Sequence, residues 1–169
     1  MLVARDWTDG LLERWAAIRP GLDVDAYQAT SRISRIGLHI ARQQEEVFGG
    51  FGLNRGEVGV LSALRVAGPP HRLSPTQLFK GLMLSSAGMT SRLDRLESQG
   101  FVKRSRDPDD RRAVVVELTA AGRKVIDEAV AANTKREGAL LGDLTASEVK
   151  TLSRLLRKML SALEPEGAT

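Results

Sequence analysis

The residues best suited to chemistry lie in a short charged segment, KRSRDPDDRR, which covers 103–112. It holds five basic and three acidic side chains, and the DPDD within it is typical of a turn. The flanking sequences VKRSR and AVVVEL are rich in β-branched residues, and Val114, Val116 and Leu118 alternate, which predicts two paired strands. We therefore expect a β-hairpin whose charged tip can bring an arginine into the minor groove of DNA.

Asp110 and Arg112 are the most informative pair in this tip. A carboxylate two residues before an arginine in a turn can hold the guanidinium by a bidentate pair, and a positioned arginine suits a groove contact. Arg106 and Arg111 are the other hairpin residues that we expect to contact DNA. The alternative is a solubilising turn that pairs its own charges, and this interpretation suits the other two aspartates of the tip.

Hydroxyl side chains precede the hairpin in SSAGMTSRLDRLE, residues 85–97. A helix here, after a short helix and the turn GLMLSS, would complete a helix-turn-helix, whose second helix enters the major groove with its N-terminal end. Arginines further along can reach a guanine edge or a phosphate oxygen, and the helix dipole favours phosphates. The candidates are Ser85, Ser86, Thr90, Ser91, Arg92 and Arg95, together with Ser74 and Thr76 at the start of the preceding helix.

Two observations leave another interpretation open for this second helix. Arg92 and Arg95 are balanced by Asp94 and Glu97, so the four charges fit a solvated helix face equally well. Two helices joined by a tight turn also occur as plain packing. The basic hairpin that follows directly is what favours contact with DNA.

Several classes of chemistry lack the residues that they need. The chain has no cysteine, which excludes disulfides, thiolate metal sites and cysteine nucleophiles. Its two histidines, His39 and His71, are 32 positions apart and have no acidic residues at ligand spacing, so we expect no metal site. No phosphate-binding loop, dinucleotide fingerprint, nucleophile elbow or zinc-protease motif is present, so we expect neither an enzyme nor a cofactor.

Composition is that of a folded protein. The chain has 169 residues, of which 42% are hydrophobic, enough for the core of one domain. Its net charge of +4, from 25 basic and 21 acidic residues, is compatible with a nucleic acid partner. Acidic residues interrupt the N-terminal segment and no stretch approaches 18 apolar residues, so we expect a soluble, cytoplasmic protein without a signal peptide or membrane span.

One local pattern marks the helix starts. LNRGEV, LSPTQL and LTASEV each place a capping residue, Asn54, Ser74 or Thr145, three positions before a glutamate or glutamine, as in a capping box. Gly100 falls where a helix ends in a left-handed residue, as in a Schellman motif. With the apolar periodicity, these signals predict seven helices. They cover about 8–18, 23–48, 54–67, 74–83, a segment from just after Ser85 or Ser86 up to Gly100, 120–142 and 145–163.

The predicted fold class is mainly α with a small β-hairpin, a winged helix-turn-helix. The DNA-binding lobe would cover 54–118, and helices in 1–50 and 120–163 would serve dimerisation within a single domain, 1–169. The terminal helices carry more apolar surface than the lobe can cover, so they must pack against each other or a partner. Helix-turn-helix proteins usually read two half-sites about 34 Å apart through a two-fold axis, which favours a homodimer over a monomer.

One continuous stretch carries a family resemblance. SSAGMTSRLDRLESQGFVKRSRDPDDRRAVVVELTAAGRKV, residues 85–125, resembles the recognition helix, the wing and the start of the following helix in the MarR family of transcription regulators. LNRGEVGVLSALR and HRLSPTQLFKGLMLSS extend the resemblance, which covers roughly 23–163. It implies a winged-helix homodimer that binds a palindromic operator and usually represses, with Asp110 and Arg112 as the D-x-R of the wing.

The first predicted helix points to one subgroup of this family. RWAAIRPGLD is similar to the added N-terminal helix of a MarR subgroup that responds to urate and other small organic anions. In that subgroup a Trp, an Asp and two Arg hold the ligand, and Trp15, Arg92 and Arg104 match three of these positions. Gly59 stands at the fourth in place of Asp, which leaves room for a bulkier anion. The alternatives are Trp15 as a core aromatic and Arg104 as a phosphate contact.

The sequence therefore predicts a ligand-responsive, sequence-specific DNA-binding repressor that binds a palindromic operator as a homodimer. A small organic anion that shares Arg92 with the recognition helix would release it. The alternative is a helical dimer that binds a protein partner and keeps the winged-helix shape without reading DNA. Salt distinguishes the two, because binding that neutralises phosphates weakens steeply as salt rises.

Overall fold

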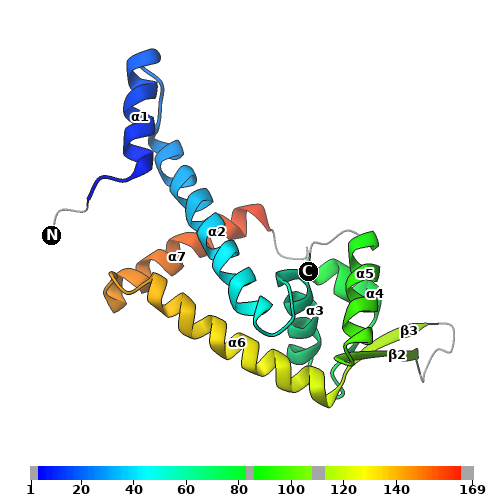
Figure 1. Ribbon diagram of the computed structural model, residues 1–169. Helices are drawn as coiled ribbons and strands as arrows, with labels where there is room; N and C mark the ends of the chain where they lie inside the picture. Colours follow the sequence, from blue (N-terminus) through cyan, green and yellow to red (C-terminus); the bar gives the residue numbers. More distant parts are fainter. Residues whose placement is uncertain (1–3, 83–85, 108–112, 165–169) are drawn as a thin grey trace. The chain divides into compact units, whose positions relative to one another are not determined.

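A computed structural model gives the fold (Figure 1). It describes residues 4–82, 86–107 and 113–164, with 80–82, 86 and 87 described by their backbone only. The elements are α1 Trp7–Ile18, α2 Asp25–Gly49, α3 Arg55–Val66, β1 Arg72–Leu73, α4 Pro75–Leu82, α5 Ser86–Ser98, β2 Val102–Arg106, β3 Val114–Leu118, α6 Ala120–Leu140 and α7 Ala146–Leu163. The predicted fold class is confirmed, and every predicted helix is present within about two residues of its expected bounds.

The three predicted capping boxes are present. In each one, the side chain of the capping residue accepts a hydrogen bond from the backbone N–H three residues on, and the acidic or amide side chain there accepts from the capping residue's own N–H. These pairs satisfy backbone donors that a helix leaves unpaired at its start. They are Asn54 with Glu57, Ser74 with Gln77, and Thr145 with Glu148.

The chain divides into two compact units, which are described separately. The first covers Met1–Gln43 and the second Gln44–Thr169. In the first unit, Arg32 of α2 donates hydrogen bonds to two carboxylates at the start of α1. Its Nε lies 2.7 Å from Asp6 Oδ2, and its Nη2 lies 2.6 Å from Asp9 Oδ1. The first turn of α1 is thus tied to α2 by Arg32.

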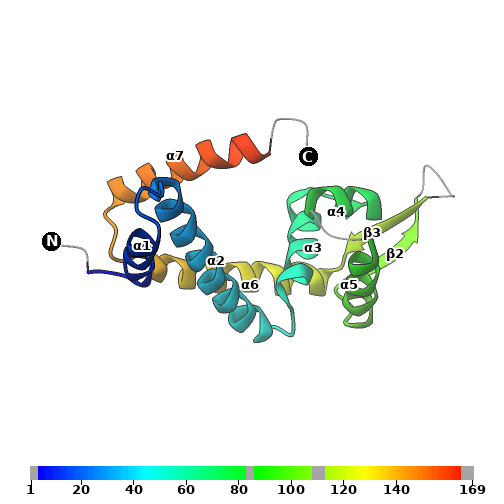
Figure 2. The ribbon, with the colours of Figure 1, turned by 90° about the horizontal axis from the view of Figure 1, so that it is seen from above.

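The core of the second unit lies between α3, α5, α6 and the sheet. Leu61 and Leu64 of α3, Leu96 of α5 and Val116 of β3 have no exposed surface, and Ile126 of α6 is 1% exposed. Burying a leucine of this kind contributes about 1.5–3 kcal/mol relative to leaving it in water. Figure 2 shows α3, α4 and α5 gathered at the base of the β2–β3 ribbon, which projects beyond them.

The sheet has three antiparallel strands in the order β1-β3-β2. Strands β2 and β3 pair along their whole length as the predicted hairpin. The sequence prediction missed β1, which pairs Arg72 with Glu117 and Leu73 with Val116. Two residues are too few to show the alternation that identifies a strand, and their partners are more than 40 positions away in the sequence.

The corner between α5 and β2 is the predicted Schellman motif. Gly100 has a φ of 74°, which favours glycine. The Phe101 N–H donates to the Leu96 carbonyl at 2.9 Å, and the Gly100 N–H donates to the Glu97 carbonyl at 2.9 Å. Helix α5 therefore ends in a fixed turn that leads directly into β2.

The start of α6 is fastened to the same corner. The Thr119 hydroxyl donates to the Gly100 carbonyl at 2.7 Å and accepts from the Gly122 N–H at 2.9 Å. A Cβ on Gly122 would lie only 2.0 Å from the Phe101 carbonyl oxygen, so the backbones meet too closely for any side chain. The wing and the first turn of α6 are therefore in direct backbone contact.

Helix α7 differs from the core of the second unit because nearly all of its side chains are exposed. It contains no buried residue, although its apolar residues repeat at helical spacing. The exposed fractions of these side chains run from 38% to 78%, for Leu152, Leu155, Leu156, Met159, Leu160 and Leu163. Among the described residues, no helix is both long enough and apolar enough to cross a membrane.

Candidate nucleic-acid interface

The helix-turn-helix is formed by α4 and α5. Thr90 and Ser91 are exposed on α5, and Thr76 is exposed on the first turn of α4. Ser74 is the cap of α4, and its hydroxyl accepts the Gln77 N–H at 3.2 Å. Of the remaining hydroxyl candidates, Ser86 is described by its backbone only and begins α5, and Ser85 lies outside the described residues.

The wing is the β2–β3 hairpin. Arg106 is exposed at the end of β2, and the Asp107 N–H donates to the Ala113 carbonyl at 2.9 Å, which closes the hairpin below its tip. The predicted tip contacts, Asp110, Arg111 and Arg112, lie outside the described residues, so the D-x-R pair stays a prediction.

A second group of charges lies on the middle of the sheet. The Lys103 Nζ is 3.1 Å from one oxygen of Glu117, and Arg72 Nη2 is 3.3 Å from the other. Both cations keep the pKa of Glu117 below its usual range, with Lys103 the larger cause. The wing therefore pairs its one carboxylate on β3 with two basic residues.

Arg92 and Arg95 of α5 both lie against the first turn of α3. A Cβ built on Gly56 would meet Arg92 Nε at 2.2 Å, so the arginine side chain covers the space that this glycine leaves. Arg95 Nε is 3.2 Å from Glu57 Oε1, and Arg95 remains 54% exposed. The sequence predicts that these two arginines contact bases or phosphates. In the structure Arg92 lies against Gly56 and Arg95 pairs with Glu57.

Arg104 of β2 is held by the two acidic residues of α5. Its Nε donates to Glu97 Oε2 at 2.8 Å, its backbone N–H donates to Glu97 Oε1 at 2.8 Å, and its Nη2 donates to Asp94. Asp94, more than Glu97, keeps the pKa of Arg104 above its usual range. The bonds from the Arg104 backbone and side chain lower the pKa of Glu97 in turn. Both carboxylates of α5 thus share one arginine of the wing as their partner.

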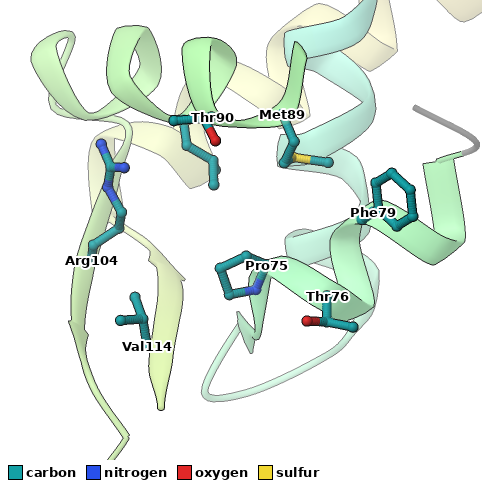
Figure 3. A pocket seen from close by; sticks show the side chains of 8 residues that line it. Pro75, Thr76, Phe79, Met89, Thr90, Arg104 and Val114 are labelled. Atoms are coloured by element: carbon teal, nitrogen blue, oxygen red, sulfur yellow. The ribbon is translucent and has the colours of Figure 1, made fainter. Parts of the chain in front are cut away.

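A pocket of about 440 Å³ lies between α4, α5 and the wing (Figure 3). Arg104 of β2 and Val114 of β3 line one side of it, as Figure 3 shows. The opposite wall is largely apolar, with Thr90 as a hydroxyl at its edge. The other lining residues are Pro75, Thr76, Phe79, Met89 and Leu93.

The residues predicted to bind an effector are distributed over both units. Trp15 lies on α1 in the first unit and is 41% exposed. Gly59 lies within α3 and is partly buried, and Arg92 and Arg104 also belong to the second unit. A site made from all four would draw on both units, and it stays a prediction. In the part of the chain that the structure describes, no three His, Asp or Glu side chains are grouped to hold a metal ion.

Comparison with known proteins identifies the family. A model of the MarR family matches residues 53–114. The HTH-type transcriptional regulator PecS of Dickeya dadantii is 34% identical over 149 residues, which cover 88% of this chain and 90% of PecS. The chain belongs to the MarR family. This confirms the predicted family resemblance and the prediction of a DNA-binding transcription regulator rather than an enzyme.

Solved structures of MarR proteins agree with this assignment. A mutant of MarR from E. coli, complexed with operator DNA, is similar with a TM-score of 0.70 and 29% identity, over 82% of this chain and 98% of that chain. BpsR of Bordetella bronchiseptica, whose DNA binding is regulated by 6-hydroxynicotinic acid, is similar with a TM-score of 0.69 and 26% identity, over 83% and 97% of the two chains. The winged helix of this MarR-family chain is therefore supported by both sequence and fold.

The sequence prediction missed the acidic partners of Arg95 and Arg104 and the apolar wall of the pocket between α4, α5 and the wing. Asp94 and Glu97 are three positions apart on α5, a spacing that places them on one helix face, which is the available signal for a shared partner. Nothing local pointed to Arg104 as that partner. The wall residues Phe79 and Met89 come from different helices, and only the fold brings them together.

Proposed function

We propose that this MarR-family chain is a sequence-specific repressor that binds a palindromic operator as a homodimer and releases it when a small organic anion binds. The observation that carries the proposal is the pairing of both α5 carboxylates with Arg104. Because Arg104 offsets one of the two negative charges, Asp94 and Glu97 repel phosphates next to the exposed Thr90 and Ser91 less than two unpaired carboxylates would. The added positive charge of Arg104 beside α5 weakens the charge argument for a protein-binding module.

The homodimer is supported by α7. Its row of exposed leucines is not covered by the residues that the structure describes, and an apolar surface of this kind is stabilised by a second copy. A two-fold axis would also place two recognition helices on the two half-sites of a palindrome. One interface therefore serves both stability and DNA reading.

An anion effector is supported by the combination of basic and apolar groups around the recognition helix. Arg104 lines a pocket whose wall is otherwise largely apolar, and its guanidinium is the group there that an aromatic carboxylate would contact. Because two carboxylates already hold Arg104, an anion would have to compete with them and would loosen the wing from α5. Trp15, Gly59 and Arg92 remain the other predicted effector contacts.

The first experiment selects bound sequences from a random duplex library and follows binding of the selected sequence against salt. We expect a palindrome, an affinity that falls steeply with salt, and a further loss in Arg112→Ala. Arg65→Ala is the matched control, since Arg65 is also an arginine but pairs with Asp127 of α6 at 2.9 Å, outside the predicted contacts. No enriched sequence, or binding indifferent to salt and to Arg112, would refute the proposal and direct attention to protein partners.

The effector is tested on the operator complex itself. Urate and a panel of aromatic carboxylates are titrated against the complex of wild type, Arg92→Ala and Arg104→Ala. We expect at least one anion to release the wild-type protein, and at least one variant to need much more of it. If no anion releases DNA at any concentration, this part of the proposal is wrong.

A further inference from the structure

Arg95 is on the recognition helix, but its contacts are with the corner between α2 and α3. Its Nε lies 3.2 Å from Glu57 Oε1, and its Nη2 donates to the Gly52 carbonyl at 3.3 Å. Gln99, just past the end of α5 at Ser98, donates to the same carbonyl at 3.0 Å. Arg95 of α5 and the following Gln99 therefore both hold one carbonyl of this corner, and Arg95 also reaches Glu57.

Glu57 is in an unusual position for a carboxylate. It is 1% exposed, and its other oxygen, Oε2, accepts the Asn54 N–H at 2.9 Å as part of the α3 capping box. A buried carboxylate needs partners for its charge, because its removal from water is costly. Arg95 is the cation that the structure places beside it, so the α3 cap and the recognition helix depend on the same side chain.

The same turn of α3 is connected to the rest of the second unit. Arg55 Nε donates to Gln44 Oε1 at 2.8 Å at the end of α2, and Gln44 Nε2 donates to Glu137 Oε1 of α6 at 2.9 Å. Arg92, three residues before Arg95, lies directly against Gly56. The start of α3 is therefore a polar junction at which α2, α5 and α6 are joined.

We propose that Arg95 is a positioning residue, which with Gln99 sets the angle of the recognition helix on the first turn of α3 and touches neither bases nor phosphates. The proposal rests on the proposed DNA-binding function and revises the role expected for Arg95 from the sequence. Operator affinity would then depend on Glu57 as much as on Arg95, although Glu57 is a buried carboxylate and carries the same sign of charge as a phosphate.

The test compares Arg95→Gln, Glu57→Gln and the double variant on the selected operator. Glutamine at position 57 keeps the capping box, as Gln77 does in α4, and removes only the charge. We expect each single variant to weaken operator binding by about three- to tenfold and the double variant to be no worse than either. The slope of log affinity against log salt should stay unchanged, since no phosphate contact is lost.

Arg106→Gln is the matched control, because Arg106 is an exposed arginine of the wing and a predicted phosphate or base contact. Its salt slope should fall by about 0.9 if it neutralises one phosphate. The proposal is overturned if Arg95→Gln lowers the slope in the same way while Glu57→Gln leaves affinity unchanged. It is equally overturned if the two losses add in the double variant.

A second measurement separates this proposal from the proposed function. Urea unfolding of wild type, Arg95→Gln, Glu57→Gln and the double variant measures the coupling between Arg95 and Glu57 without any DNA. If no operator is found but the two substitutions are not additive in unfolding, the repressor function fails while the link between α5 and α3 stands. If the unfolding effects are additive, the link itself is wrong.

Discussion

Leu96 of α5 and Leu163 of α7 each belong to a row of apolar residues at helical spacing, yet Leu96 is fully buried and Leu163 is 78% exposed. The winged-helix lobe covers its row with α3, α6 and the sheet, whereas α7 contains no buried residue. An apolar row therefore predicts that one face of a helix is buried. It does not tell whether the same chain or a partner buries that face. In the lobe the cover is in the same chain, and for α7 we propose a second copy.

The largest difference should appear in unfolding. Leu96→Ala removes buried apolar volume from the lobe and should lower the free energy of unfolding by about 2–5 kcal/mol. Leu163→Ala is the matched substitution on α7 and should change the free energy of unfolding of the lobe by less than about 0.5 kcal/mol, because Leu163 lies outside the lobe core. Urea unfolding followed by circular dichroism measures both. Similar losses at the two positions, independent of protein concentration, would show that α7 is covered within one chain and not by a second copy.

The next test moves from stability to assembly. Leu155→Glu places a charge in the row that we assign to the dimer, and each dimer would carry it twice. We expect the dimer dissociation constant, measured by sedimentation, to rise by at least about tenfold, or about 1.4 kcal/mol. Lys150→Glu, an exposed charge change on the same helix outside the leucine row, is the control. A dimer that tolerates Leu155→Glu would assign the interface to another surface.

Matched helix caps give a smaller contrast. Asn54 caps α3 in the lobe and Thr145 caps α7, both in capping boxes. Asn54→Ala should cost about 1 kcal/mol of lobe stability, since a buried backbone donor loses its acceptor. Thr145→Ala should leave lobe unfolding unchanged and reduce only the helix content of α7. Equal effects on the lobe would contradict the separation of the two regions.

The smallest effect concerns pH. Hydrogen bonds from the Arg104 backbone and side chain lower the pKa of Glu97, so its stabilising contribution is present above the pKa of an unfolded glutamate, about 4.3. The contribution is lost as pH falls from there through the lower folded value. Glu97→Gln should therefore flatten the acid side of the lobe stability curve slightly. Glu148→Gln should leave that curve unchanged, although the Thr145 hydroxyl also lowers the pKa of Glu148 in α7.

Helix boundaries were predictable because their signals are local. The capping boxes and the Gly100 turn each span a few residues, and they fixed the ends of α3, α4, α5 and α7. Strand β1 could not be predicted, since its partners lie on β3 and nothing within Arg72 and Leu73 indicates them. Local chemistry determines where elements begin and end, and long-range pairing determines what joins them.

The candidate site shows the same limit. The hydroxyl residues of α5 were identified from their type, and those with described side chains are exposed. The orientation of Arg95 was missed, because its partner Glu57 is 38 positions away on another helix. One signal was available: Arg92, Arg95 and Gln99 repeat at three and four residues, beside the buried row of Met89, Leu93 and Leu96. Side chains at such positions flank a packed surface and tend to serve it.

The close backbone contact between Gly122 and Phe101 has a mechanical consequence. Phe101 directly precedes β2, and its carbonyl oxygen lies against Gly122 and accepts the Thr119 N–H. A rotation of the wing at this contact would therefore tilt α6. With 21 residues, the helix is about 31 Å long. A tilt of about 10° would displace its far end by about 5 Å, more than the spacing of one base-pair step. A small rotation at the DNA thus corresponds to a movement at the distant end of α6 that spectroscopic labels could follow.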